Sequence, residues 1–180
     1  MHVFSMLRRR SLCIATVSWT LVTIAFPLVQ LNAKAQNVAA ISGIVTGNVQ
    51  GVGFRAMIQR RAIRYNLAGS VENKSDKTVQ FFLQGDEDRI DKALNAIRNG
   101  TKKSSDVNVS VSPASIRPDL KTFTVVGWTS VTRNIARPYD LVFNLRPDDT
   151  TIGKHEAKKV WLTICEKTMK GADSGKCDKD

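Results

Sequence analysis

Arg55 stands where the start of a helix would ordinarily repel a cation. The segment Gly47–Arg61, GNVQGVGFRAMIQRR, begins as a loop with three glycines and continues with the spacing of a helix. The first turn of a helix carries partial positive charge and unpaired N–H groups, so it favours an acid. A bound phosphate would attract both those N–H groups and a guanidinium. The pattern therefore favours an anion site, and the alternative is that Arg55 points into solvent.

The sequence has few residues that could form a metal site or an activated nucleophile. The only histidines are His2 and His155, and no C-x-x-C pair occurs, so neither a zinc site nor a histidine-activated nucleophile is expected. Ser70 and Ser75 have no base nearby in the sequence. Asn73, judged from its position alone, is typical of a turn asparagine at the end of a hairpin.

The elements that must position the glycine loop alternate along the chain. Apolar periodicity predicts helices and strands in the order β-α-β-β-α-β, followed by one more strand. This order is typical of an α+β, ferredoxin-like sandwich, in which two helices cover one face of an antiparallel sheet. The fold hosts many functions and does not name one. The expected strands are Ala40–Val45, Leu67–Asn73, 78–85, 106–113 and 121–128, and the expected helices are Phe54–Tyr65 and Asp86–Asn99.

Two motifs in this region resemble those of the acylphosphatase family. GNVQGVGFR resembles its signature G-x-V-Q-G-V-x-F-R at every fixed position, and LAGSVENKSDKTV partly resembles a second motif, G-W-V-x-N-x-x-D-G-x-V. The resemblance covers about Ile41 to Trp128, roughly half of the chain. In the second region Ser70 replaces a tryptophan, Lys77 a glycine that would shape the hairpin turn, and Asn66 a glycine before the strand.

The resemblance implies a ferredoxin-like fold and an enzyme that hydrolyses the carboxyl-phosphate bond of acyl phosphates. It also implies that no metal and no organic cofactor is needed. Arg55 would bind the phosphate, and Asn73 would hold the attacking water. The backbone of the loop would complete the phosphate site at Val49, Gln50, Gly51, Val52 and Gly53.

The N-terminus is typical of an export signal. Three arginines, Arg8 to Arg10, precede the apolar run Ser11–Phe26, and Ala33 and Ala35 occupy the small positions of a cleavage site. We expect residues 1–35 to be a signal peptide that is cleaved after Ala35, giving a periplasmic or secreted protein without a stable membrane anchor. The alternative is an uncleaved membrane anchor, although the run is short for a spanning helix.

The remaining chain is expected to hold an acylphosphatase-like domain, residues 36–129, and a C-terminal extension, residues 130–180. Within the extension Tyr139–Pro147 and Lys159–Cys165 look strand-like, and the end of the chain looks disordered. Cys165 and Cys177 could pair in an oxidising compartment or remain as free thiols.

Charge leaves three classes of function open. The chain has a formal net charge of +11, and removal of residues 1–35 leaves 23 basic against 16 acidic residues. Such a surplus suits nucleic acid, but the sequence lacks the aromatic-basic strand motif of RNA-binding sheets, so nucleic acid is not the expected partner. The leading hypothesis is a monomeric acylphosphatase with a small acyl phosphate as its substrate. The second is a catalytically weak or inactive exported module that binds an anion or another protein.

Overall fold

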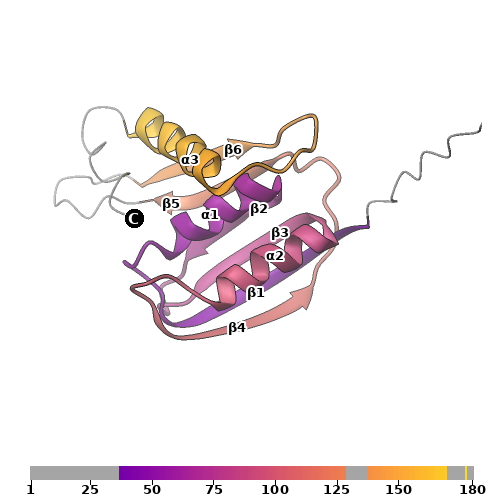
Figure 1. Cartoon of the computed structure of the whole chain (residues 1–180). Coiled ribbons are helices and arrows are strands. Elements are labelled where there is room, and N and C mark those ends of the chain that lie inside the picture. The colour runs from indigo at the N-terminus through magenta and orange to yellow at the C-terminus, as the bar shows by residue number, and fades with distance from the viewer. Residues whose placement is uncertain (1–36, 129–137, 170–176, 178–180) are drawn as a thin grey trace, which may run out of the picture. The chain divides into compact units, whose positions relative to one another are not determined.

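The computed structural model describes residues 37–128, 138–169 and 177 of the 180-residue chain. Strands and helices alternate along the first part of the described chain, and one further strand and helix follow near its end (Figure 1). The elements are β1 (Val38–Asn48), α1 (Phe54–Tyr65), β2 (Ala68–Asn73), β3 (Val79–Asp86), α2 (Glu87–Arg98), β4 (Ser105–Pro113), β5 (Thr122–Trp128), β6 (Tyr139–Asn144) and α3 (Lys154–Thr168).

The strands form one six-stranded sheet in the order β4-β1-β3-β2-β5-β6. Neighbouring strands are antiparallel except β2 and β5, which run parallel with Glu72 opposite Val126. The four strands β4-β1-β3-β2 together with α1 and α2 make the ferredoxin-like arrangement, so the predicted fold class is confirmed. Strands β5 and β6 widen this sheet beyond that arrangement, and α3 adds a third helix.

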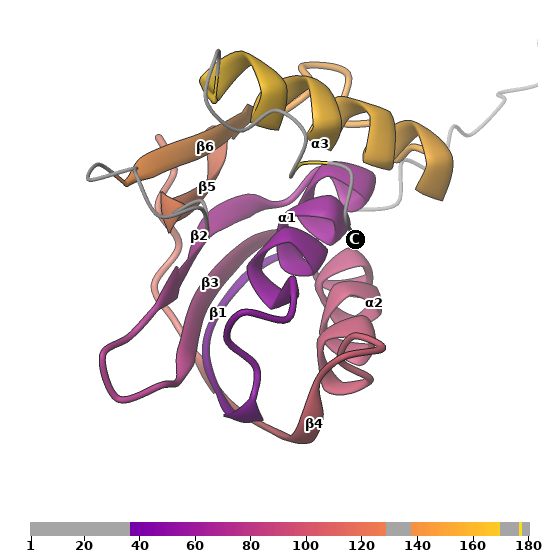
Figure 2. The same cartoon turned by 90° about the vertical axis from the view of Figure 1, so that its left-hand side faces the viewer.

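All three described helices cover the same face of the sheet, and none of them lies on the opposite face (Figure 2). The core lies between these two layers, where Val79, Phe81 and Leu83 of β3 share one buried cluster with apolar residues of α1 and α2. Gly43 on β1 lies opposite Phe81, and a Cβ atom there would lie 2.2 Å from the Phe81 ring. A glycine is therefore required where the ring crosses β1.

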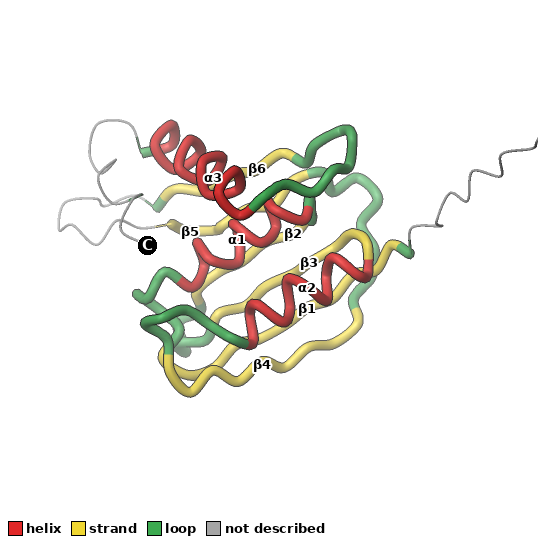
Figure 3. The backbone as a smooth tube through the Cα atoms, viewed as in Figure 1, coloured by secondary structure: helices red, strands yellow, loops and turns green. Residues whose placement is uncertain are grey.

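The C-terminal helix α3 corrects the expectation of a strand at Lys159–Cys165 (Figure 3). That short window is rich in β-branched and aromatic residues, which favour strands. However, Ala157, Trp161 and Cys165 are all buried and recur every four residues, which is the spacing of one helix face. This face packs on α1 and β6, so the segment is buried as a helix.

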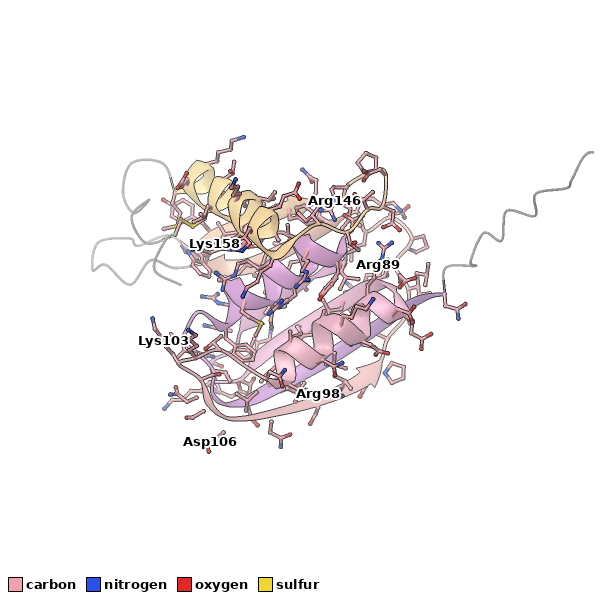
Figure 4. All side chains as sticks on the ribbon, in the orientation of Figure 1. Arg89, Arg98, Lys103, Asp106, Arg146 and Lys158 are labelled. Atoms are coloured by element: carbon pink, nitrogen blue, oxygen red, sulfur yellow. A yellow bond between two sulfur atoms is a disulfide. The ribbon has the colours of Figure 1, made fainter. Side chains whose placement is uncertain are left out.

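Polar contacts fasten the segment after β6 to the helix layer. Asn66 ends α1 in the left-handed conformation (φ 54°), and its side chain also bonds to the segment after β6. Its Nδ2 donates to the carbonyl of Arg146 and to Asp149, while its Oδ1 accepts from the Arg146 N–H at 2.8 Å. Arg89 of α2 pairs with Asp149 at 2.8 Å, and Figure 4 shows Arg89 and Arg146 at this end of the helix layer. The extension is therefore built into the fold.

A disulfide joins Cys165 of α3 to Cys177, with their Cα atoms 6.0 Å apart. The signal peptide expected at residues 1–35 lies outside the described residues. Of the end expected to be disordered, only Met169 and Cys177 are described. Within the described part of the chain, no helix combines the length and apolar character needed to cross a bilayer.

The burial of α3 makes a prediction about stability. Trp161 is fully buried and packs edge-to-face on Trp128, with ring centroids 6.3 Å apart. We expect Trp161→Ala to lower the free energy of unfolding by about 3–5 kcal/mol in urea denaturation, because it leaves a cavity between α3 and the sheet. Lys159→Ala, on the exposed side of α3, should change it by less than about 0.5 kcal/mol. Equal effects would show that α3 does not pack on the domain.

Candidate active site

Glycines shape the loop between β1 and α1. Gly47 lies at an irregularity in the pairing of β1 with β4, and its positive φ (107°) brings its Cα against the Asp106 carbonyl, where a Cβ atom would clash at 2.2 Å. Gly51 and Gly53 also have positive φ angles (71° and 74°), which only glycine adopts freely. No atom lies within 4 Å of a Cβ placed on Gly51, so the middle of the loop is open to a ligand.

The loop leaves its backbone donors unpaired. Among the described residues, the N–H groups from Gln50 to Arg55 donate no hydrogen bond. Helix α1 also has no side-chain cap at Gly53 and no acid in its first turn. The other twelve-residue helix, α2, has both, because Asp86 accepts from the Arg89 N–H and acids follow it. The contrast indicates that the start of α1 suits an anion.

Two side chains fix the loop against its neighbours. Gln50 donates from Nε2 to the carbonyls of Lys74 (2.9 Å) and Thr78 (2.8 Å), which ties the loop to the β2–β3 turn. On its other side, the Thr101 hydroxyl donates to the Val52 carbonyl at 3.1 Å. The conformation of the loop is therefore set by elements on both sides of it, whereas the sequence indicated only the backbone of Gln50 as functional.

Arg55 turns from the start of α1 toward the end of β5. Its Nη1 atom donates to the carbonyls of Val126 (2.9 Å) and Gly127 (3.0 Å), and its guanidinium lies 5.4 Å from the centre of the Trp128 ring. Burial lowers the pKa of Arg55, and the charge of Glu72 opposes this shift. An arginine remains protonated at neutral pH. A partly buried guanidinium therefore offers a strong positive charge to an anion.

Asn73 is the last residue of β2 and faces the same side of the sheet as Arg55. Side chains alternate along a strand, so Asn73 shares the helix-covered face with the buried Val71, whereas Glu72 lies on the open face. The pairing of β2 with β5 ends at Glu72 and Val126, so Asn73 directly follows this last pair, next to the end of β5 that holds Arg55. Its Oδ1 is buried and accepts no hydrogen bond from any described residue. Such an orphaned acceptor calls for a partner such as a water molecule.

The substitutions in the second motif stay clear of this arrangement. Ser70 points to the open face, where it lines a shallow cavity of about 200 Å³ with Glu72, Phe82 and Arg117, so it is no nucleophile for the loop. Lys77 occupies the hairpin turn with a positive φ of 68°, the conformation that favours glycine. An anion loop needs converging donors at the surface and no deep cavity.

Comparisons with known proteins agree with this geometry. A family model described as acylphosphatase matches residues 41–125. An acylphosphatase from Geobacillus kaustophilus is 37% identical over 83 residues, which are 46% of this chain and 88% of that protein. The chain belongs to the acylphosphatase family. Hydrolysis of acyl phosphates is thereby indicated at the level of the family.

Other acylphosphatases give the same extent of match. The protein from Bacillus subtilis is 35% identical over 46% of this chain and 91% of its own length. The crystal structure of acylphosphatase from Bacillus subtilis aligns at 32% identity over 51% of this chain and 99% of that chain, with a TM-score of 0.46. The family match ends at residue 125, so Val126, Gly127 and Trp128, which contact Arg55, lie just beyond it.

Among the described residues, no group of three or more His, Cys, Asp or Glu residues is placed to hold a metal ion. The contacts of Arg55 were not foreseen from the sequence, because two of them are to backbone carbonyls, which any residue supplies. The sequence signal that existed was Trp128 at the end of an expected strand, where an aromatic face can meet a cation.

The tether at Gln50 can be tested by substitution. We expect Gln50→Leu to lower the free energy of unfolding by about 1 kcal/mol, because the carbonyls of Lys74 and Thr78 each lose one of two donors and keep a backbone donor. Hydrogen exchange of the Val49 and Met57 amides, which donate to the Gly47 and Gly53 carbonyls, should accelerate as the loop loosens. Gln80→Leu, an exposed glutamine on β3, should shift stability by less than about 0.5 kcal/mol. Unchanged exchange in Gln50→Leu would argue against the tether.

Proposed function

We propose that this acylphosphatase-family protein hydrolyses acyl phosphates to a carboxylate and phosphate by means of a positioned water. The observation that carries the proposal is that three groups near the start of α1 and the ends of β2 and β5 have hydrogen-bonding capacity left unused by the described residues. These are the unpaired N–H groups of the loop, the partly buried guanidinium of Arg55 and the orphaned Oδ1 of Asn73. The first two suit a phosphoryl group and the third suits a water molecule.

The phosphoryl group would be bound by the backbone from Val49 to Gly53 together with Arg55. The loop is open at Gly51, and the helix N-terminus adds its positive end. Arg55 keeps its Nε and Nη2 donors for the phosphoryl oxygens, because only Nη1 is used by the β5 carbonyls. These donors would stabilise the charge that is spread over the equatorial oxygens in the transition state.

Asn73 would supply the orientation of the nucleophile. Its Oδ1 accepts a hydrogen bond from water and directs the water oxygen at phosphorus, in line with the leaving carboxylate. The new P–O bond forms as the P–O bond to the carboxylate breaks, with its electron pair leaving on the carboxylate. One proton of the water passes to a phosphoryl oxygen of the substrate. Since a carboxylate leaves readily, strong general-acid help is unnecessary.

Replacement of Arg55 and Asn73 tests this assignment. We expect Arg55→Gln and Asn73→Ala each to reduce phosphate release from acetyl phosphate by about 100-fold or more, because each removes a group that acts on the transition state. Arg55→Lys should recover only part of the loss, since lysine keeps the charge without the planar fork. The measurement is steady-state phosphate release, with the free energy of unfolding followed in parallel.

Two matched variants control for the loss of an arginine or an asparagine elsewhere. Arg61→Gln, further along α1, and Asn108→Ala, on the exposed part of β4, should leave turnover within about twofold of the parent protein. Wild-type turnover retained in both Arg55→Gln and Asn73→Ala would refute the assignment. Phosphate binding by calorimetry without any turnover would instead support the anion-binding module.

We also propose that the protein is exported, on the basis of the apolar run Ser11–Phe26 and the small residues Ala33 and Ala35. When the full chain is expressed in a bacterial host, the exported fraction should begin at Gln36 by intact mass spectrometry. Substitution of Ala35 by a bulky residue such as Leu should block cleavage there. A chain that starts at Met1 and stays in the membrane fraction would favour the uncleaved anchor.

A further inference from the structure

The acceptors that hold Arg55 come from a distorted part of the sheet. The pairing of β5 with β6 slips between Val125 and Trp128, and Gly127 within the slip has a positive φ of 61°. In a regular strand, successive carbonyls point to opposite neighbouring strands and one donor could not reach both. At this irregularity the carbonyls of Val126 and Gly127 both accept from Arg55 Nη1. The N–H of Gly127 donates to Asp140 Oδ1 of β6 at 2.9 Å, which fixes the irregular segment from its other side.

The ring of Trp128 makes the third contact with Arg55. The Cζ atom of Arg55 lies 5.4 Å from the ring centre, within the range of a cation–π interaction. Trp128 is itself held by Trp161 of α3, with the two rings at 75° to one another. Trp161 is fully buried, and Arg60 of α1 lies over its ring at 5.3 Å. A continuous line of packed groups therefore leads from α3 to the guanidinium.

We infer that the part of the chain beyond the family match is a positioning device for Arg55, in which Trp128, Asp140 and Trp161 hold the guanidinium in the orientation that binds the phosphoryl group. This inference rests on the proposed function for its role in turnover. Three of the five guanidinium N–H groups, on Nε and Nη2, find no acceptor among the described residues and form one edge of the fork. A free arginine side chain would lose rotamer freedom when it binds an anion, whereas a prearranged one has lost it on folding.

A double-mutant cycle separates positioning from ordinary packing. Inorganic phosphate is titrated calorimetrically into the full chain and into Trp128→Leu, Arg55→Gln and the double variant. We expect Trp128→Leu to weaken phosphate binding about tenfold in the parent background and less than twofold in the Arg55→Gln background, because its effect passes through Arg55. Trp128→Phe, which keeps an aromatic face, should recover most of the affinity. Equal losses in both backgrounds, or no recovery with Phe, would overturn the inference.

Substitution of Asp140 gives an independent test if Trp128→Leu folds poorly. Asp140→Ala removes the acceptor of the Gly127 N–H, and we expect the KM for acetyl phosphate to rise several-fold with a smaller change in kcat. Asp140→Asn keeps a carbonyl oxygen at that place and should restore the parent KM. A loss that Asn fails to rescue, or that appears in kcat alone, would contradict a role in positioning.

A nitrogen-15 spectrum of the arginine side chains keeps this inference distinct from the proposed function. The Nε–H signal of Arg55, identified by its absence in Arg55→Gln, should carry a ring-current shift that disappears in Trp128→Leu. If the parent protein neither binds phosphate nor hydrolyses acetyl phosphate, the proposed function fails while this shift still supports the held guanidinium. A signal that does not move in Trp128→Leu would overturn the positioning device even in an active enzyme.

Discussion

The structure depends on a helix that begins with a cation and has no acid to compensate it. At the start of α2, Asp86 and the acids that follow it compensate the positive end of the helix and its unpaired N–H groups. In α1 the same positive end meets Arg55 and a loop of unpaired amides, so like charges converge at Gly53. This arrangement is electrostatically unfavourable when it is empty and favourable when an anion is bound. The rest of the fold must therefore hold the loop in this conformation, because the loop would otherwise relax to another one.

The restraints come from separate parts of the chain. Gln50 ties the loop to the β2–β3 turn, and Thr101 holds it from the α2–β4 connection. The guanidinium of Arg55 is restrained in turn by the end of β5. Because the restraints converge from three directions, a shift of any one element would misalign the donors. Acyl phosphate hydrolysis needs little beyond such alignment, since the leaving carboxylate is already stable.

Local sequence patterns were sufficient to predict the strands and helices of the ferredoxin-like part. They could not predict contacts between segments that are distant in the sequence. The bounds of α1 follow from apolar spacing and from Asn66, and Arg55 could be singled out from charge placement alone. The strand expected at Lys159–Cys165 was wrong, because a seven-residue window hides the four-residue spacing that begins at Ala157. The burial of Gln59 was equally hidden, since its partner is the Leu141 carbonyl 82 residues away. Any residue supplies a backbone carbonyl, so such acceptors cannot be recognised from the sequence.

The choice of neutral acceptors for Arg55 has a physical consequence. A carboxylate beside the guanidinium would orient it and also cancel much of the charge that an anion needs. The carbonyls of Val126 and Gly127 orient it without adding a charge, and the Trp128 face does the same through its quadrupole. The carboxylate whose charge does reach Arg55, that of Glu72, lies on the opposite face of the sheet and is paired with Lys74 at 2.7 Å. The site thus holds its cation firmly and keeps its charge available for the phosphoryl group that we propose it binds.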